Sequence, residues 1–173
     1  MHAVARSVSP AGGQLGLIVH EIEAPRSRIA FAAAIETHLR TLQLDVVHDT
    51  GTGWFADVFQ PHGGSRFAAN RQNLELLPRA LRPWKRWTSQ WLPRYREFAE
   101  LAERQYSNRN CLFLPLSRMV ATAMEHLHGV KPQQMRIVYN GVDTERFTPD
   151  VDDRHRSSIR QELGIDPDEV LLL

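Results

Sequence analysis

The chain has 173 residues, a length that suits one domain and is long enough to bury a hydrophobic core. Hydrophobic residues make up 42% and charged residues 24%, as in an ordinary soluble globular protein, and the net charge of +1 argues neither for nor against a polyanionic partner. The single cysteine excludes an internal disulfide and fits a reducing compartment. No run of about 18 apolar residues is present, and residues 1–13 lack the pattern of a signal peptide, so we expect a cytoplasmic protein.

Strand-like and helix-like segments alternate, which predicts an α/β fold: a Rossmann-like parallel sheet flanked by helices. The expected elements, in chain order, are a strand over residues 15–22, a helix with Phe31, Ile35, Leu39 and Leu42 on one face, a strand over 46–48, short pieces between Pro78, Pro83 and Pro93, a helix over 94–106, a strand over 111–116, a helix from the Ser117 cap to Gly129, and a strand over 136–139.

Beyond Pro149 the sequence becomes acidic and polar, as in a linker, before a helix over about 153–163 and an apolar strand from Val170. We expect residues 1–149 to form one domain that lacks its first βαβ unit, because the only glycine-rich candidate turn, residues 10–13, precedes a strand instead of a helix. Residues 150–173 are expected to be a linker and the first strand of a second domain. A domain rarely ends inside a buried strand, so we expect a truncation.

Two glycine-containing loops follow expected strands. Gly51, Thr52 and Gly53 come directly after the strand that ends at residue 48, and ligands of open parallel sheets bind beyond the carboxyl ends of the strands. Glycines at such a place let backbone N–H groups approach a phosphate or a sugar. The alternative is a turn that needs a positive φ angle.

The second loop contains His62 followed by Gly63 and Gly64. Its imidazole or backbone carbonyl could face a reacting sugar, and the alternative is a histidine in a surface loop. His126 and His128 are two residues apart on a helix and cannot face one ligand, so we assign them no metal. The sequence contains no zinc-ligand spacing and no Ser/His/Asp signature.

Residues 66–96 are strongly basic, with eight arginines and lysines against Glu75 alone. Trp84, Trp87 and Trp91 are interleaved with these charges, which include Lys85 and Arg86. Tryptophans beside basic residues favour an anionic membrane surface. Nucleic-acid binding uses the same residue types, and a solvated helix with its tryptophans packed inward is the other alternative.

Residues 136–143 read Arg-Ile-Val-Tyr-Asn-Gly-Val-Asp, followed by Phe147 and Pro149. This stretch resembles the I-x-N-G-V-D-x-x-x-F-x-P signature of family 4 glycosyltransferases, which closes their N-terminal domain. Residues 116–120 resemble that family's strand followed by its S-x-x-V helix start, and residues 128–132 match its usual spacing. Residues 160–164 resemble the opening of its donor-binding domain. Within the family, the glycine-rich aromatic loop and residues 94–98 are most similar to lipopolysaccharide-core glucosyltransferases, which carry a basic membrane-interacting segment in this region.

The resemblance implies a GT-B enzyme that transfers a hexose from a nucleotide-diphospho-sugar, with retention of configuration, to a glycan or glycolipid acceptor. No metal and no cofactor besides the donor is implied, because helix N-termini and basic side chains stabilise the leaving diphosphate. The family's N-domain histidine would fall on His62. Ser117 would border the acceptor cleft together with the loop at residues 51–53, and Asn140 and Gly141 would form its hinge side. The enzyme would be cytoplasmic, or peripheral on the inner face of the membrane.

The sequence departs from the family pattern in two places. The family's first glycine-rich loop has no convincing counterpart here, and the donor domain with its E-x7-E carboxylates is missing. We therefore expect the chain alone to be inactive. Two other functions stay open: a membrane-surface or polyanion-binding module built on residues 84–96, and an unrelated nucleotide-binding domain. The nucleotide-binding alternative is weak, because no G-x-G-x-x-G follows an expected strand and precedes a helix. A nucleic-acid partner is not favoured.

Overall fold

The computed structural model describes residues 1–7, 16–24, 26–148, 154–166 and 169–170, and the fold is α/β, as the sequence predicts. The chain divides into two units, Met1–Tyr139 and Asn140–Leu173. The first unit holds every described strand and all helices but one. In the second unit the described helix is α6 (Arg154–Glu162), which confirms the helix expected over about 153–163.

The strands form two parallel sheets. In the first, β1 (His2–Ala5) pairs with β2 (Ile18–Glu21). In the second, β4 (Val58–Phe59) lies between β3 (His48–Asp49) and β5 (Leu112–Phe113). Every pairing is parallel, so the carboxyl ends of β3, β4 and β5 share one edge of their sheet.

Three details of the strands differ from expectation. Neither β1 nor β4 was expected, and β1 supplies a strand before the glycine-rich residues 10–13, which lie outside the described residues together with residue 15. Residues 136–139 do not form the expected strand: a single bridge joins Met135 to Phe113. The reason is lack of burial, because the side chains of Ile137, Val138 and Tyr139 are 40%, 42% and 63% exposed.

Three expected helices are confirmed. They are α1 (Arg28–Leu39), α4 (Pro93–Ser107) and α5 (Arg118–His128). The hydroxyl of Ser117 accepts a hydrogen bond from the N–H of Val120 and so caps α5, and Gly129 ends this helix at a φ of +67°. The expected caps at both ends of α5 are therefore correct.

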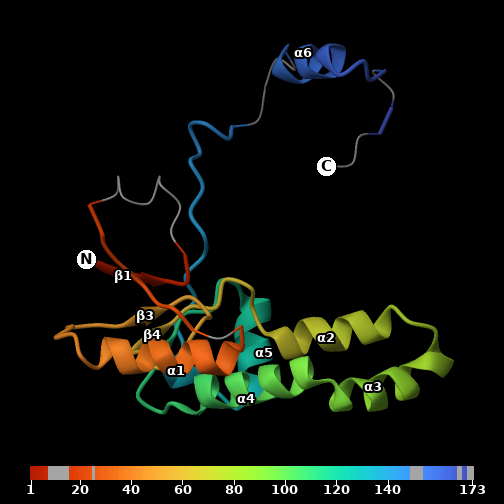
Figure 1. The fold of residues 1–173 in the computed structure, drawn as a ribbon. Helices are drawn as coiled ribbons and strands as arrows, with labels where there is room; N and C mark the ends of the chain where they lie inside the picture. Colours follow the sequence, from red (N-terminus) through yellow and green to blue (C-terminus); the bar gives the residue numbers. More distant parts are fainter. Residues whose placement is uncertain (8–15, 25, 149–153, 167–168, 171–173) are drawn as a thin grey trace. The chain divides into compact units, whose positions relative to one another are not determined.

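The segment between the second loop and α4 is more helical than its prolines suggest. It contains α2 (Arg66–Glu75), the short 3₁₀ helix η2 (Arg79–Leu81) and α3 (Arg82–Trp91). Figure 1 shows α2 and α3 extending away from the strands and α4 returning toward α1, and contacts join α2 to α3, α3 to α4 and α4 to α1. A further 3₁₀ turn, η3 (Pro132–Gln134), follows α5.

Two clusters of buried side chains hold the first unit together. One surrounds β4 and β5 and consists of Phe59, Cys111, Phe113, Met124, Val130 and Met135. The other lies along α1 and consists of Ile22, Phe31, Ile35 and Leu39. Because these clusters fix the strands and α1, they also fix where the loops after β3 and β4 begin. The expected strand from Val170 falls mostly outside the described residues.

Candidate functional site

The loop after β3 is organised by the carboxylate of Asp49. Its Oδ1 accepts the backbone N–H groups of Gly51 (2.5 Å) and Thr52 (2.7 Å), and its Oδ2 accepts that of Gly53 (2.6 Å). Gly51 adopts a φ of +118°, which only glycine adopts without strain. In this conformation all three N–H groups bind Asp49, and the predicted role of this loop in binding a ligand stays a prediction.

Gly53 also anchors the loop to α4. A Cβ atom placed on Gly53 would lie 2.8 Å from Oδ2 of Asp49, so a larger residue would displace the carboxylate. The Gly53 carbonyl accepts a hydrogen bond of 2.7 Å from the buried side chain of Gln105 on α4. The loop is thus held from both sides, by β3 and by α4.

The loop after β4 turns sharply through Gly64, whose φ is +62°, and leads into α2. The N–H of His62 donates to the carbonyl of Thr50 across a distance of 3.4 Å, so the two loops touch through their backbones. The His62 side chain itself is exposed. In the part of the chain that the structure describes, its imidazole forms no hydrogen bond.

A small cavity of about 80 Å³ lies between the two loops and α4. It brings together Gly51, Gly63 and Gly64, which the sequence singles out, and leaves Thr52, Gly53 and His62 outside its lining. Its other polar or aromatic lining residues include Arg28, Arg66, Phe67, Phe98, Gln105, Tyr106 and His128. Ligand pockets usually measure about 300–1,000 Å³, so a hexose needs the two loops to separate.

His128 also lines this cavity, a position that was not predicted from the sequence. Its Nε2 lies 2.9 Å from the hydroxyl of Ser65, and its ring stacks on Tyr106 with centroids 3.8 Å apart. Burial lowers the pKa of His128, which favours the neutral imidazole, and raises the pKa of Tyr106 to about 12. The contact joins residues that are 63 positions apart, so no local pattern predicts it.

Three other predicted site residues do not line this cavity. Ser117 follows β5 at the same edge of the sheet and is half-buried, and its hydroxyl is engaged in the cap of α5. Asn140 and Gly141 are exposed and belong to the second unit, which is described by itself. Their predicted role at the hinge stays a prediction.

The tryptophans of α3 face solvent. Trp84, Trp87 and Trp91 are 64%, 60% and 71% exposed, which excludes the alternative of tryptophans packed inward. Lys85 and Arg86 are exposed beside them. Positions 84, 87 and 91 fall on one face of a helix, and the rings of the last two meet edge to face with centroids 6.1 Å apart.

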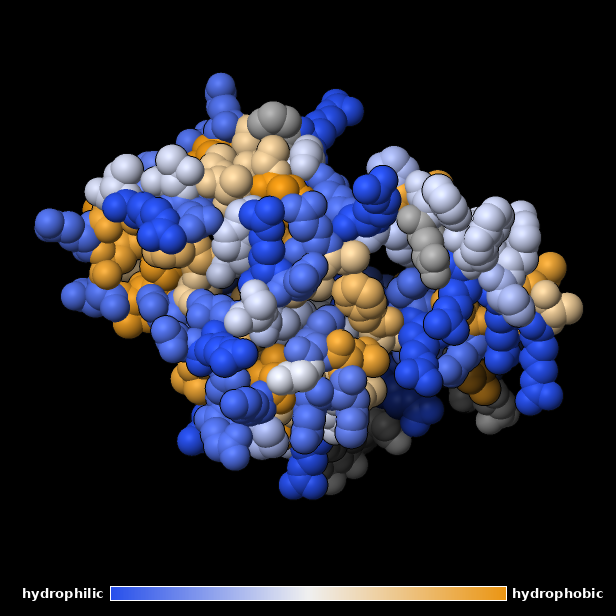
Figure 2. All heavy atoms as spheres, turned by 90° about the horizontal axis from the view of Figure 1, so that it is seen from below, coloured by the Kyte–Doolittle hydropathy of each residue, from blue (hydrophilic) through white to orange (hydrophobic). Residues whose placement is uncertain are grey.

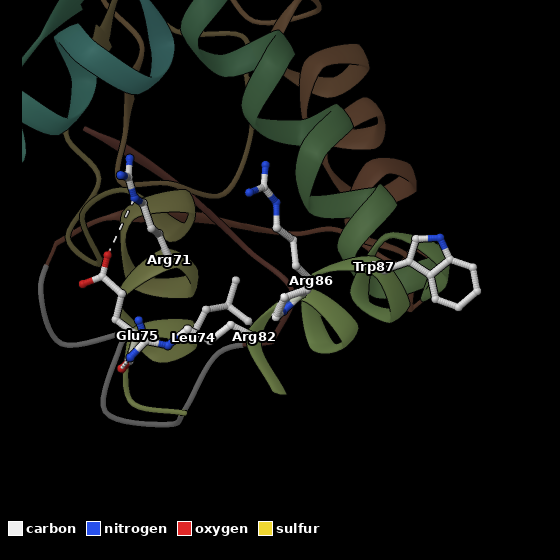
Figure 3. A pocket seen from close by; sticks show the side chains of 7 residues that line it. Arg71, Leu74, Glu75, Arg82, Arg86 and Trp87 are labelled. Atoms are coloured by element: carbon white, nitrogen blue, oxygen red, sulfur yellow. Dashed lines mark hydrogen bonds and ion pairs between the residues drawn. The ribbon is translucent and has the colours of Figure 1, made fainter. Parts of the chain in front are cut away.

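Between α2 and α3 the surface is hollowed by a basic cavity of about 470 Å³, drawn in Figure 3. Arg71 and Glu75 form an ion pair of 3.9 Å at one side, and the guanidinium of Arg82 donates to the carbonyls of Glu75 and Leu77. Arg86 lines the other side. Figure 2 shows one face of the molecule, where hydrophilic residues are interspersed with small hydrophobic patches.

Two further observations concern membranes and metals. Among the described helices, none is long and apolar enough to cross a membrane. In the same residues, no three or more histidine, cysteine, aspartate or glutamate side chains gather as ligands of a metal ion would.

Comparison with known proteins identifies the family of this chain. Residues 11–146 match the family described as Glycosyltransferase Family 4, and because this match covers well over half of the chain, the chain belongs to that family. Among solved structures it is similar to the crystal structure of WaaG, a glycosyltransferase involved in lipopolysaccharide biosynthesis, with a TM-score of 0.66 and 15% identity. A search of curated proteins gave no match.

The match to WaaG covers 97% of this chain and 44% of the WaaG chain, so the chain spans less than half the length of that structure. At 15% identity the likeness shows the fold alone, and it agrees with an N-terminal-like domain of the GT-B type.

Proposed function

We propose that this chain is the acceptor-side part of a retaining glycosyltransferase. The enzyme would move a hexose from a nucleotide-diphospho-sugar to a lipid-linked or polysaccharide acceptor. The observation that carries this proposal is the family match over residues 11–146, and the two loops at the carboxyl ends of β3 and β4 support it.

In this proposal the loops after β3 and β4 form the wall of the acceptor cleft. His62 would act from the second loop beside the reacting sugar, and Ser117, Asn140 and Gly141 would border the cleft. The backbone contact between His62 and Thr50 supports a shared role of the two loops, because opening the cavity between them would move both.

We further propose that the chain needs a second Rossmann domain to turn over its donor. Helix N-termini and basic side chains of that domain would stabilise the leaving diphosphate without a metal ion or a cofactor. Closure of both domains over the donor would exclude water and complete the site, as in other enzymes that close over their substrates.

The exposed tryptophans of α3 favour a second element of the proposal: the protein is cytoplasmic and binds the inner face of an anionic membrane peripherally. Indole rings sit at the level of lipid headgroups, and the charges of Lys85 and Arg86 would meet lipid phosphates. If the transferase assignment fails, a membrane-surface or polyanion-binding module is the function that α3 favours.

The acceptor assignment can be tested by binding alone. Phosphatidylcholine vesicles carrying extracted membrane glycolipids would be sedimented with the protein, before and after enzymatic removal of the glycans. We expect retention that depends on the glycan, because the cleft recognises a sugar. Equal retention by both vesicle preparations would contradict an acceptor site in this chain.

A further inference from the structure

A third cavity, of about 380 Å³, lies at the start of α1, α2 and α4 and shares lining residues with the small cavity between the two loops. It contains three arginines, one from each helix: Arg28, Arg66 and Arg94. Arg28, Arg66 and Phe98 line both cavities, so this basic cavity opens beside the two predicted acceptor loops.

The guanidinium groups are gathered around aromatic rings. The guanidinium carbons of Arg28 and Arg66 lie 4.5 Å and 4.8 Å from the centroid of Phe98, so they are within about 9.3 Å of each other. Arg94 lies over the neighbouring ring of Tyr95, at 5.3 Å from its centroid. One phosphate has several acceptor oxygens and can bind more than one guanidinium group.

The three arginines of the cavity form no ion pair among the described residues, and no carboxylate lines the cavity. Glu97 lies close to Arg28, but its carboxylate accepts the hydroxyl of Ser27 and the backbone N–H of Arg28. Those bonds, led by the one from Ser27, lower the pKa of Glu97, and the charge of Arg28 lowers it further, so Glu97 compensates part of the charge of Arg28 and none of its contacts among the described residues involves Arg66 or Arg94.

The remaining lining suits a phosphate that is attached to a larger molecule. Asn70 and Asn73 of α2 add amide donors, and Phe67 adds a further aromatic wall. Phe67, Asn70 and Tyr95 also line a neighbouring cavity of about 700 Å³, whose basic residues are Arg71, Arg86 and Arg96. There is therefore room for the body of a ligand beyond the group held by the three arginines.

We propose that the Arg28–Arg66–Arg94 cavity binds a phosphate group carried by the acceptor. Three arginines line this one cavity without a carboxylate among its lining residues, and a dianionic phosphate can accept hydrogen bonds from their guanidinium groups while compensating their charge. The proposal rests on the proposed function in one respect: the phosphate belongs to the acceptor. Its test measures binding without turnover, so a failed transfer assay would leave its result unchanged.

The experiment is calorimetric titration of the chain with inorganic phosphate. It compares the wild type with the double variant Arg28→Gln/Arg66→Gln and with a control, Arg79→Gln/Arg109→Gln, which removes the same charge outside the cavity. We expect saturable binding that weakens at least tenfold in the cavity variant and less than threefold in the control. Absence of saturable binding to the wild type, or equal weakening in both variants, would overturn the proposal.

Folding of the variants is monitored by circular dichroism. If Arg28→Gln/Arg66→Gln does not fold, the single variant Arg94→Gln is tested instead, because Arg94 is exposed and its guanidinium lies over the ring of its neighbour Tyr95. It should weaken phosphate binding at least threefold, and a loss no larger than that of Arg109→Gln would overturn the proposal.

Competition then distinguishes a sugar phosphate from a lipid headgroup. Glucose 1-phosphate and phosphatidylcholine vesicles containing phosphatidic acid would each compete with inorganic phosphate, in a Lys85→Gln/Arg86→Gln background that weakens binding through α3. Competition by the sugar phosphate alone assigns the group to the glycan, and competition by the vesicles alone assigns it to the lipid. Competition by both supports a site for the phosphate of either, whereas competition by neither would overturn the link to the acceptor and leave an adventitious ion only.

Discussion

Asp49 has a structural role at the end of β3. Its two carboxylate oxygens bind three successive backbone N–H groups, and the loop they hold forms one wall of the small cavity. The sequence pattern placed the ligand at these N–H groups. In the structure these N–H groups bind Asp49, so a ligand would have to displace this carboxylate or bind other groups of the loop.

Replacing Asp49 tests that role. Asp49→Ala removes the acceptor of three N–H groups, and we expect the free energy of unfolding to fall by about 2 kcal/mol, since each hydrogen bond to a charged group contributes about 1.5–3 kcal/mol and water compensates part of the loss. Urea denaturation provides the measurement. Asp45→Ala is the matched control, because Asp45 is exposed on the segment before β3. Equal stability of the two variants would contradict the role of Asp49.

His62 carries the catalytic part of the proposal. In an enzyme that joins this chain to a donor-binding domain, His62→Ala should lower kcat/KM about 30-fold, which corresponds to ~2 kcal/mol of lost transition-state stabilisation. His126→Ala is the control, since His126 is also exposed but belongs to α5 and does not line the cavity between the loops. A value of kcat/KM within about threefold of wild type would show that His62 is not at the reaction centre.

At the scale of elements, α3 presents an unusual surface for a helix of a folded domain. Three of its ten residues are tryptophans that are more than half exposed, and the charges next to them are basic. Such a helix is suited to the plane of a membrane interface, with its rings at headgroup level.

We expect the protein to bind phosphatidylglycerol vesicles more tightly than phosphatidylcholine vesicles. Lys85→Gln/Arg86→Gln should weaken that binding about 30-fold, at about 1 kcal/mol for each basic residue near the surface, and added salt should weaken it further. The measurement is sedimentation with vesicles. Arg109→Gln/Lys131→Gln, which removes the same charge elsewhere, should bind nearly as the wild type does. Vesicle binding that changes with neither the charge of the lipid nor the salt concentration would contradict the membrane assignment.

The prolines explain why α2 and α3 were difficult to predict. Pro83 and Pro93 lie in the first turns of α3 and α4, where the missing N–H costs nothing because it has no partner within the helix. The sequence interpretation treated these prolines as breaks between short pieces. They mark where helices begin, so the region contains two helices of ten residues.

At the scale of the whole molecule, the sequence predicted what depends on local signals. Ser117 and Gly129 gave both ends of α5, and the pattern around Asn140 pointed to the family that the comparison then identified. Contacts between residues that are far apart in the sequence could not be predicted from it. Ser65 meets His128 and Gln105 meets Gly53 only because the fold brings their helices and loops together, and no spacing along the chain encodes those pairs.

The strands were also difficult to predict from the sequence, because they are short. β3, β4 and β5 have two paired residues each, too few for an alternating pattern to be recognised. Burial around Phe59 and Phe113 stabilises them, while residues 136–139 have the apolar composition of a strand but remain exposed. Composition alone could not separate these two cases.

The measurement that tests the central claim most directly is hexose transfer from radiolabelled UDP-glucose, UDP-galactose and GDP-mannose to glycolipid-containing vesicles. It compares this chain alone with the same chain joined to the donor-binding domain of a family 4 enzyme. We expect no transfer by the chain alone and transfer of at least one hexose by the two-domain protein. Transfer by the chain alone, or failure of the folded two-domain protein with every donor, would contradict the assignment of this chain as the acceptor-side part of a glycosyltransferase.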